Sequence, residues 1–189
     1  MKSAYLDYLD EIDFRLPSVD NVSLGQLPGK KSAKAKVYIG TSGWNDKRMA
    51  SKLYPAKTPV KKYFESYAKI FNTVEIQSTK FAKPKAEILR EWYERSSSDF
   101  KFVLLMPQYI SYQRHLDAQE IQDDFHQFWN LAVELKEKLA SLYISLPAHF
   151  NPKRLEELYH FLDALPSNVP LHLDFKNKKI NESEKHLGI

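Results

Sequence analysis

The sequence contains no cysteine, and this absence removes several kinds of chemistry at once. Without a thiol there is no disulfide framework, no thiolate metal site and no cysteine nucleophile, and such chains suit a reducing compartment. No stretch is long and apolar enough for a membrane span, and residues 1–17 carry acids where a secretory signal needs an apolar core. We therefore expect a cytoplasmic protein without membrane contact.

Two nucleotide-binding motifs are also missing. The turn at residues 40–44 lacks the G-x-G-x-x-G spacing of a dinucleotide site, and no G-x-x-x-x-G-K-[ST] phosphate loop occurs. The six histidines show no H-E-x-x-H or similar close spacing. We expect no cofactor and no bound metal.

Positive charge is present in modest excess. Lys and Arg total 28 against 24 Asp and Glu, which gives a net charge of +4 and a pI of about 9.0. The excess gathers as lysines within residues 30–36, 57–62 and 176–179. Such patches can bind nucleic-acid phosphates, but without an aromatic platform tied to the lysines a solvated surface is the favoured interpretation.

The chain divides into an N-terminal arm, residues 1–35, and one domain, residues 36–189. Residues 5–16 have apolar positions at helical spacing before Pro17 and a Gly/Pro/Lys-rich stretch. This short amphipathic helix either caps the core or packs on a partner. With 43% hydrophobic residues, 189 residues bury one good core.

From residue 36 onward, β-rich runs alternate with helical periodicity. Thr58-Pro59, Pro84, the capping-box pair Asp117 and Glu120, and Asn151-Pro152 mark helix starts, and the helix after Asp117 is expected to run to Leu139. Strands are expected at residues 37–41, 73–76, 102–106, 142–146 and 171–175. This α/β pattern fits an open doubly wound sheet or a closed β/α barrel, between which periodicity does not choose.

Several short motifs occur in a specific order: IGTSGW at 39–44, FNTVEIQST at 71–79, FKF with MP within 100–107, SLPAHF at 145–150 and LHLDF at 171–175. Together they resemble the YecE-like family, domain of unknown function 72. The resemblance implies a TIM-type (β/α) barrel and no established reaction. About five β/α units are visible where a closed barrel has eight. We therefore expect a partial barrel with a parallel sheet. Either the chain is a fragment, or it pairs with a second copy or a partner chain that completes the sheet, or it folds as an open sheet.

Barrel sites lie at the carboxyl ends of the strands, and this position selects the candidate residues. The catalytic candidates are Glu75, Asp174 and Lys176. The binding candidates are Thr41, Ser42, Trp44, Gln77, Ser145, His149 and Asn177.

These residues allow more than one function. Glu75 or Asp174 can act as a general base and Lys176 can stabilise an anion, as in a hydrolase-like enzyme for a phosphorylated or nucleic-acid substrate. The same residues are equally consistent with a structural role, in which an internal carboxylate–lysine network neutralises buried charge. Against the family pattern, Leu105 replaces a lysine, and Asp174, Lys176 and Asn177 replace glutamate, arginine and histidine. These changes favour a catalytically degenerate member that binds a ligand or has no activity.

Overall fold

The computed structural model describes residues 36–166, 170–177 and 180. The predicted N-terminal arm and its helix lie outside these residues. The strands are β1 (Gly40–Ser42), β2 (Thr73–Ile76), β3 (Lys101–Leu105), β4 (Leu139–Leu146) and β5 (Leu171–Phe175). The longer helices are α2 (Lys47–Leu53), α3 (Tyr63–Ala68), α4 (Ala86–Arg95), α6 (Gln119–Ala132) and α7 (Leu155–Asp163). Shorter helices are η2 (Val60–Lys62), η3 (Gln77–Lys80), α5 (Gln108–Ser111), η4 (Val133–Lys138) and η5 (Pro152–Arg154).

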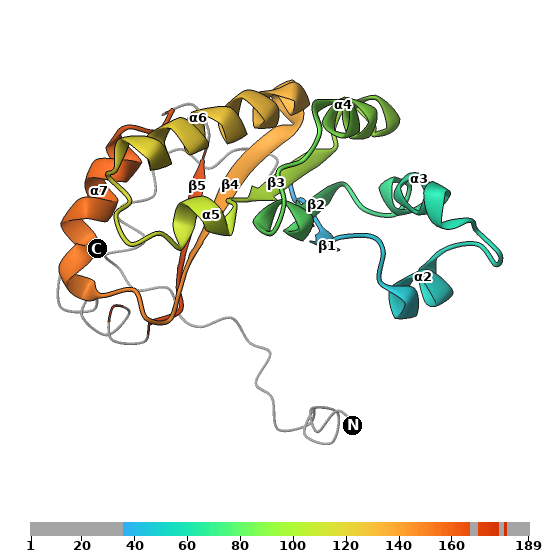
Figure 1. The fold of residues 1–189 in the computed structure, drawn as a ribbon. Coiled ribbons are helices and arrows are strands. Elements are labelled where there is room, and N and C mark those ends of the chain that lie inside the picture. Colours follow the sequence, from blue (N-terminus) through green and yellow to red (C-terminus); the bar gives the residue numbers. More distant parts are fainter. Residues whose placement is uncertain (1–35, 167–169, 178–179, 181–189) are drawn as a thin grey trace, which may run out of the picture. The chain divides into compact units, whose positions relative to one another are not determined.

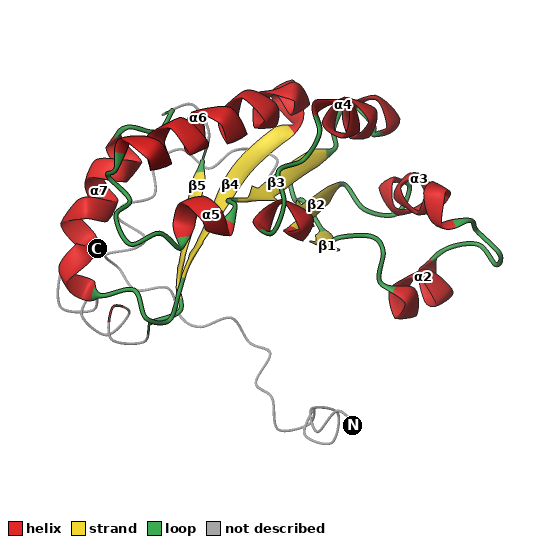
Figure 2. Cartoon of the chain, in the orientation of Figure 1, coloured by secondary structure: helices red, strands yellow, loops and turns green. Residues whose placement is uncertain are grey.

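All five strands pair in parallel in the order β1-β2-β3-β4-β5 (Figure 1). A doubly wound sheet reverses its strand order and receives helices on both faces. Here the order never reverses, so right-handed crossovers bring the described crossover helices α3, α4, α6 and α7 to the same face. Figure 2 shows the helices beside the yellow strands of this sheet. This arrangement is that of a TIM-type barrel. It excludes the doubly wound sheet, which the sequence pattern also allowed.

The core lies between the sheet and these helices. One side of the sheet contributes apolar side chains from alternate positions, and the helices contribute large aromatic and aliphatic residues. The buried set includes Val74, Ile76, Phe102, Leu104, Leu142, Ile144, Phe64, Tyr67, Leu89, Phe125, Phe128 and Phe161. The apolar surface that these side chains bury, and not intrinsic helix propensity, stabilises the short helices.

The opposite side of the sheet is the inner face, which would line the interior of a closed barrel. The strand register places Ser42, Glu75, Val103 and Ser141 in one row. Leu105, Tyr143 and His172 form the next row, and Ser145 with Asp174 the third. The inner face is therefore markedly more polar than the helix-covered face.

The first strand is shorter than the predicted 37–41. The Asn72 side chain accepts a hydrogen bond from the Ile39 amide at 2.7 Å and donates to the Val37 carbonyl at 2.9 Å. The Asn72 side chain thus makes the hydrogen bonds that a paired strand would make, and regular pairing with β2 begins at Gly40. A Cβ at Gly40 would lie 2.0 Å from the Thr73 carbonyl oxygen, so only glycine allows β1 to approach β2 there.

Three helix predictions need correction. Thr58 does not cap the helix that follows it, because Pro59 is the N-cap of η2 and the Thr58 hydroxyl donates instead to the Pro55 carbonyl. No capping box forms at Asp117 and Glu120, because Ala118 is the N-cap of α6 and no side chain caps it. The helix also does not run to Leu139, since it ends at Ala132 and Lys136 has φ of 46° within η4. In the described part of the chain, no helix has both the length and the apolar character needed to cross a membrane.

Candidate functional site

The candidate site is a set of polar side chains on the inner face, at the carboxyl ends of β2, β4 and β5. We call this set the carboxyl-end rim. Its centre is Asp174 of β5, which pairs in register with Ser145 of β4. Lys176, two residues beyond Asp174, forms an ion pair with its Oδ2, and the Ser145 hydroxyl donates to the same oxygen at 3.4 Å. The predicted residues Ser145, Asp174 and Lys176 thus form one network.

A third donor reaches Asp174 from a residue that the sequence analysis missed. Tyr143 lies two positions before Ser145 on β4 and hydrogen-bonds to the Asp174 carboxylate. Burial, followed by this hydrogen bond and the charges of Asp174 and Glu75, raises the pKa of Tyr143 to about 12. Tyr143 is therefore a neutral hydrogen-bond donor that senses both carboxylates. The period of two along a strand was the signal that could have found it.

The ionisation of Asp174 reflects two opposing effects. Partial burial disfavours the charged carboxylate, but hydrogen bonds from Lys176, Tyr143 and Ser145 outweigh it and hold the pKa of Asp174 below its usual value. The hydrogen bond to Asp174 in turn raises the pKa of Lys176. Carboxylate and ammonium are therefore both charged at neutral pH.

Glu75 has a different environment. It is half-buried on β2, and Gln77 Nε2 donates to its Oε1 at 3.2 Å. Gln77 begins η3 and does not extend the strand, yet its amide still reaches the inner face. Among the described residues no lysine or arginine forms an ion pair with Glu75. It is the carboxylate of the rim that is left open to a ligand.

A cavity of about 220 Å³ adjoins this group at the carboxyl ends of β1 and β2. Three predicted residues line it, namely Ser42, Trp44 and Gln77. The Trp44 ring also packs on Phe64 and Trp92, with centroids at 4.8 and 5.1 Å. Trp44 is thus a fixed wall, anchored from behind by the core.

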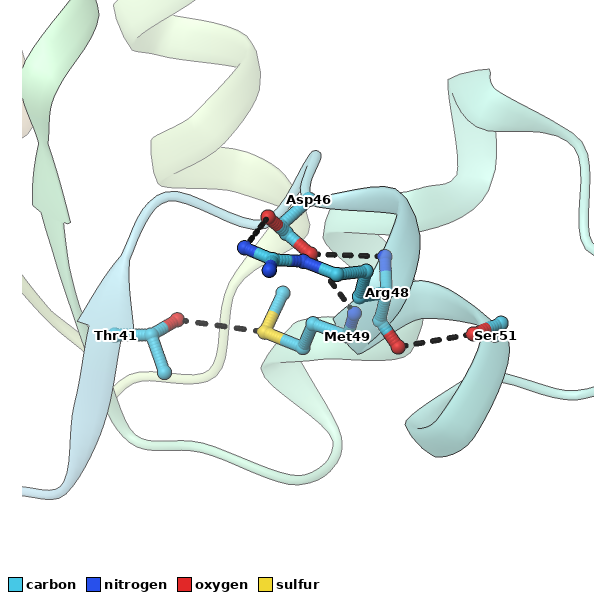
Figure 3. A network of polar contacts seen from close by, with 5 residues as sticks. All are labelled: Thr41, Asp46, Arg48, Met49 and Ser51. Carbon is cyan, nitrogen blue, oxygen red and sulfur yellow. Dashed lines mark hydrogen bonds and ion pairs between the residues drawn. The ribbon is translucent and has the colours of Figure 1, made fainter. Parts of the chain in front are cut away.

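Thr41 lies away from this cavity lining, on the helix side of β1. Its hydroxyl donates to the Gly43 carbonyl at 2.8 Å and points toward the Met49 sulfur at 3.6 Å (Figure 3). Asp46 caps α2 by accepting from the Arg48 and Met49 amides at 2.8 and 3.0 Å. These contacts tie α2 to the end of β1 and so shape one side of the cavity.

Comparison with known proteins now identifies the family. The model of the protein of unknown function DUF72 matches residues 38–187. The chain belongs to the DUF72 family. It is 38% identical over 105 residues to UPF0759 protein YecE from Escherichia coli K12 and from the O157:H7 strain, a match that covers 54% of this chain and 37% of each relative.

Solved DUF72 structures share the fold. A DUF72 protein from Enterococcus faecalis V583 superposes with a TM-score of 0.59 at 16% identity, covering 79% of this chain and 55% of its own. One from Thermotoga maritima MSB8 gives a TM-score of 0.56 at 20% identity, covering 72% and 55%. This chain thus spans little more than half of these structures and about a third of the curated relatives.

Two further binding candidates of this DUF72 chain lie in the loops beyond β4 and β5. Asn177 donates from Nδ2 to the Phe150 carbonyl at 2.9 Å, which joins the end of β5 to the loop after β4. His149 is exposed in that loop, three residues beyond β4. Asn177 thus has a structural contact, and His149 is accessible from solvent.

His115, Asp117 and Glu157 place one potential metal-ligand atom each within 4.8 Å of one another. However, Arg154 donates from Nε and Nη2 to the two Glu157 oxygens, both at 2.8 Å, and lowers the pKa of that carboxyl. A guanidinium already neutralises this cluster, so it does not fit a metal ion well. The expectation that the protein binds no metal stays a prediction.

Proposed function

We propose that this DUF72 chain is a binding protein that holds a small polar ligand at the carboxyl-end rim without converting it. The observation that carries the proposal is the state of Asp174, whose carboxylate already has Lys176, Tyr143 and Ser145 as donors. A general base needs an accessible lone pair and a pKa near the working pH. Asp174 does not meet the second condition, because these donors hold its pKa below its usual value.

The remaining rim groups suit recognition. Glu75 offers a carboxylate with one amide neighbour, Gln77 offers its own amide, and the adjoining cavity has Trp44 as an apolar wall. A few convergent polar groups beside an aromatic surface are typical of a small-molecule site. The fixed Asp174 network keeps Tyr143 in place beneath the ligand.

The second candidate is a hydrolase-like enzyme for a phosphorylated or nucleic-acid substrate. One observation favours it: Glu75 has no ion-pair partner within the described residues, and its charge helps to raise the pKa of Tyr143. In that case Glu75 is the general base and Lys176 stabilises the anion that develops. The two candidates differ in whether the ligand is chemically changed.

A thermal-shift screen of the full chain against a panel of small metabolites tests the proposal. A ligand that raises the melting temperature is then tested with Glu75→Gln, which should abolish the shift, and with Glu94→Gln. Glu94 is exposed on α4, so this control changes the same groups away from the rim. Mass spectrometry after long incubation should recover the ligand unchanged. Conversion by the wild-type chain that Glu75→Gln abolishes would contradict the binding role and support the enzyme.

A further inference from the structure

The half-buried carboxylate of Glu75 forms no ion pair with a lysine or arginine among the described residues. Its Oε1 accepts a hydrogen bond from Gln77 Nε2 at 3.2 Å, and this donor is a neutral amide. Lys176, on the same rim, forms its ion pair with Asp174 instead. Charges removed from water are usually paired, because burial weakens their hydration. Glu75 is therefore a carboxylate that a cation from outside can pair with.

The cavity of about 220 Å³ at the carboxyl ends of β1 and β2 adjoins this carboxylate. Gln77, which donates to Glu75, lines the cavity, and so does Ser42, which is the register partner of Glu75 on β1. Register partners in neighbouring strands lie about 5 Å apart and face the same side of the sheet. A ligand in the cavity can therefore reach the Glu75 carboxylate.

The residues that line the cavity supply negative charge and no positive charge. They include Asp46 but no lysine, arginine or histidine. Arg48 lies 3.6 Å from Asp46 Oδ2, but its side chain is 92% exposed and is not part of the lining. Trp44 forms an aromatic wall of the cavity, and tryptophan is the aromatic side chain that attracts cations most strongly. The charges around the cavity thus favour a cation over an anion.

Resting on the proposed function, we propose that the ligand is a small molecule with a primary ammonium group, which pairs with Glu75 while the rest of the molecule lies in the cavity against Trp44. An ammonium has three donors and no acceptor. The Glu75 carboxylate, the Gln77 side-chain carbonyl and the Ser42 hydroxyl are acceptors that match it. The cavity is smaller than the roughly 300–1,000 Å³ pockets of drug-sized ligands, so the ligand is small.

A metal ion suits Glu75 less well than an ammonium does. Protein sites for metal ions gather several ligand side chains around the ion. Within residues 36–166, 170–177 and 180, only His115, Asp117 and Glu157 bring three acidic or histidine ligand atoms within 4.8 Å of one another. Glu75 has no such companions, whereas an ammonium needs only one carboxylate and neutral acceptors.

Calorimetry of the full chain with millimolar ethanolamine, which is protonated at neutral pH, tests the inference. Ethylene glycol, in which a hydroxyl replaces the ammonium, should bind more weakly by about tenfold or more, because it lacks the charge-assisted contact. Glu75→Gln should weaken ethanolamine binding about tenfold for the same reason. Glu94→Gln changes the same groups at an exposed position of α4, so this control should bind ethanolamine as the wild type does.

A lysine placed beside Glu75 should take the place of the ligand's ammonium. Gln77→Lys should therefore raise the melting temperature and abolish ethanolamine binding. Gln119→Lys is the matched control, because Gln119 is exposed on α6 and also donates from Nε2 to a carboxylate, that of Asp123, at 2.9 Å. This control should bind ethanolamine as the wild type does.

Three results would overturn the inference. They are equal binding of ethanolamine and ethylene glycol by the wild type, undiminished ethanolamine binding by Gln77→Lys, and magnesium binding that depends on Glu75 and excludes ethanolamine. Absence of ethanolamine binding, together with a panel ligand that lacks an ammonium but depends on Glu75, would overturn the ammonium inference and keep the proposed function. Conversely, ethanolamine binding that depends on Glu75, together with conversion of a panel ligand that depends on Glu75, would support the ammonium site and refute the binding-only role.

Discussion

At the scale of single residues, Tyr143 links the two carboxylates of the rim. It donates to Asp174 and lies in the electrostatic field of Glu75. A tyrosine in this position keeps its proton at neutral pH and can bond only as a donor to these acids. The rim therefore depends on a residue that is neither acid nor base under physiological conditions.

The raised pKa of Tyr143 predicts a loss of stability in alkali. In the unfolded chain a tyrosine loses its proton near its usual pKa of about 10, whereas in the folded chain Tyr143 keeps it to about 12. The stabilisation is therefore complete below the unfolded pKa and is lost as the pH rises through the folded one. Tyr54, whose burial also raises its pKa to about 12, acts in the same direction.

Urea unfolding at about pH 9 and about pH 11 measures this effect, which should reach about 1–3 kcal/mol for Tyr143. Tyr143→Phe should reduce the loss between the two pH values. Tyr159→Phe serves as control because Tyr159 is 48% exposed on α7. If the free energy of unfolding depended on pH equally in wild type and Tyr143→Phe, the raised pKa of Tyr143 would be refuted.

Part of the site followed from the sequence by residue spacing. Asp174 and Lys176 are two residues apart, as are Glu75 and Gln77, and both pairs interact even though Gln77 lies in η3 and not in the strand. Thr41 and Asn177 were chosen from position alone, and their contacts hold the backbone instead. Spacing shows which side of a strand a residue faces, but not whether a neighbouring helix or loop takes its hydrogen bonds.

At the scale of elements, Lys138 shows how a buried cation can end a helix. Its Nζ donates to the Tyr93 carbonyl at 2.6 Å and to the Ser96 carbonyl and hydroxyl, both at 3.0 Å. These groups belong to the carboxyl end of α4, where helix carbonyls lack partners within the helix. Lys138 is only 4% exposed, so the bonds form away from bulk water.

Lys138→Met should destabilise the protein by about 1–3 kcal/mol, because buried carbonyls lose their donor. Chemical denaturation measures the change in the free energy of unfolding. Lys52→Met, on an exposed position of α2, should change it by less than about 0.5 kcal/mol. A similar small effect of Lys138→Met would show that the carbonyls find other donors.

Predictability also differs among the elements. Strands β2 and β5 have the bounds that β-rich composition predicts, and Asn151 caps η5 by accepting from the Lys153 amide. Helices α2 and α5, with seven and four residues, were missed because so few residues show no period. Asp46, which caps α2, was the local signal for the first of them.

At the scale of the whole molecule, the sheet that the described residues form has two open edges. Within the described residues β1 pairs only with β2, and β5 pairs only with β4. Unpaired edges are a template for further strands. We propose that a second copy or a partner chain adds strands there, as the family's barrel fold requires.

Sedimentation of the purified chain should then show association that increases with concentration, and the melting temperature should rise with it. Leu173→Lys, at the β5 edge, should weaken association. Ile88→Lys is the matched control, since Leu173 and Ile88 are both 38% exposed and Ile88 lies on α4. A monomer with one concentration-independent unfolding transition would exclude this proposal.

The sequential strand order also affects how the protein folds. Each strand pairs with the strand that precedes it in the chain, so no sheet contact waits for a distant segment. Such a topology has a lower contact order than a sheet with distant neighbours, and lower contact order accompanies faster folding. During synthesis each β/α unit can therefore dock on the unit before it, and the growing sheet presents a single new edge at each step.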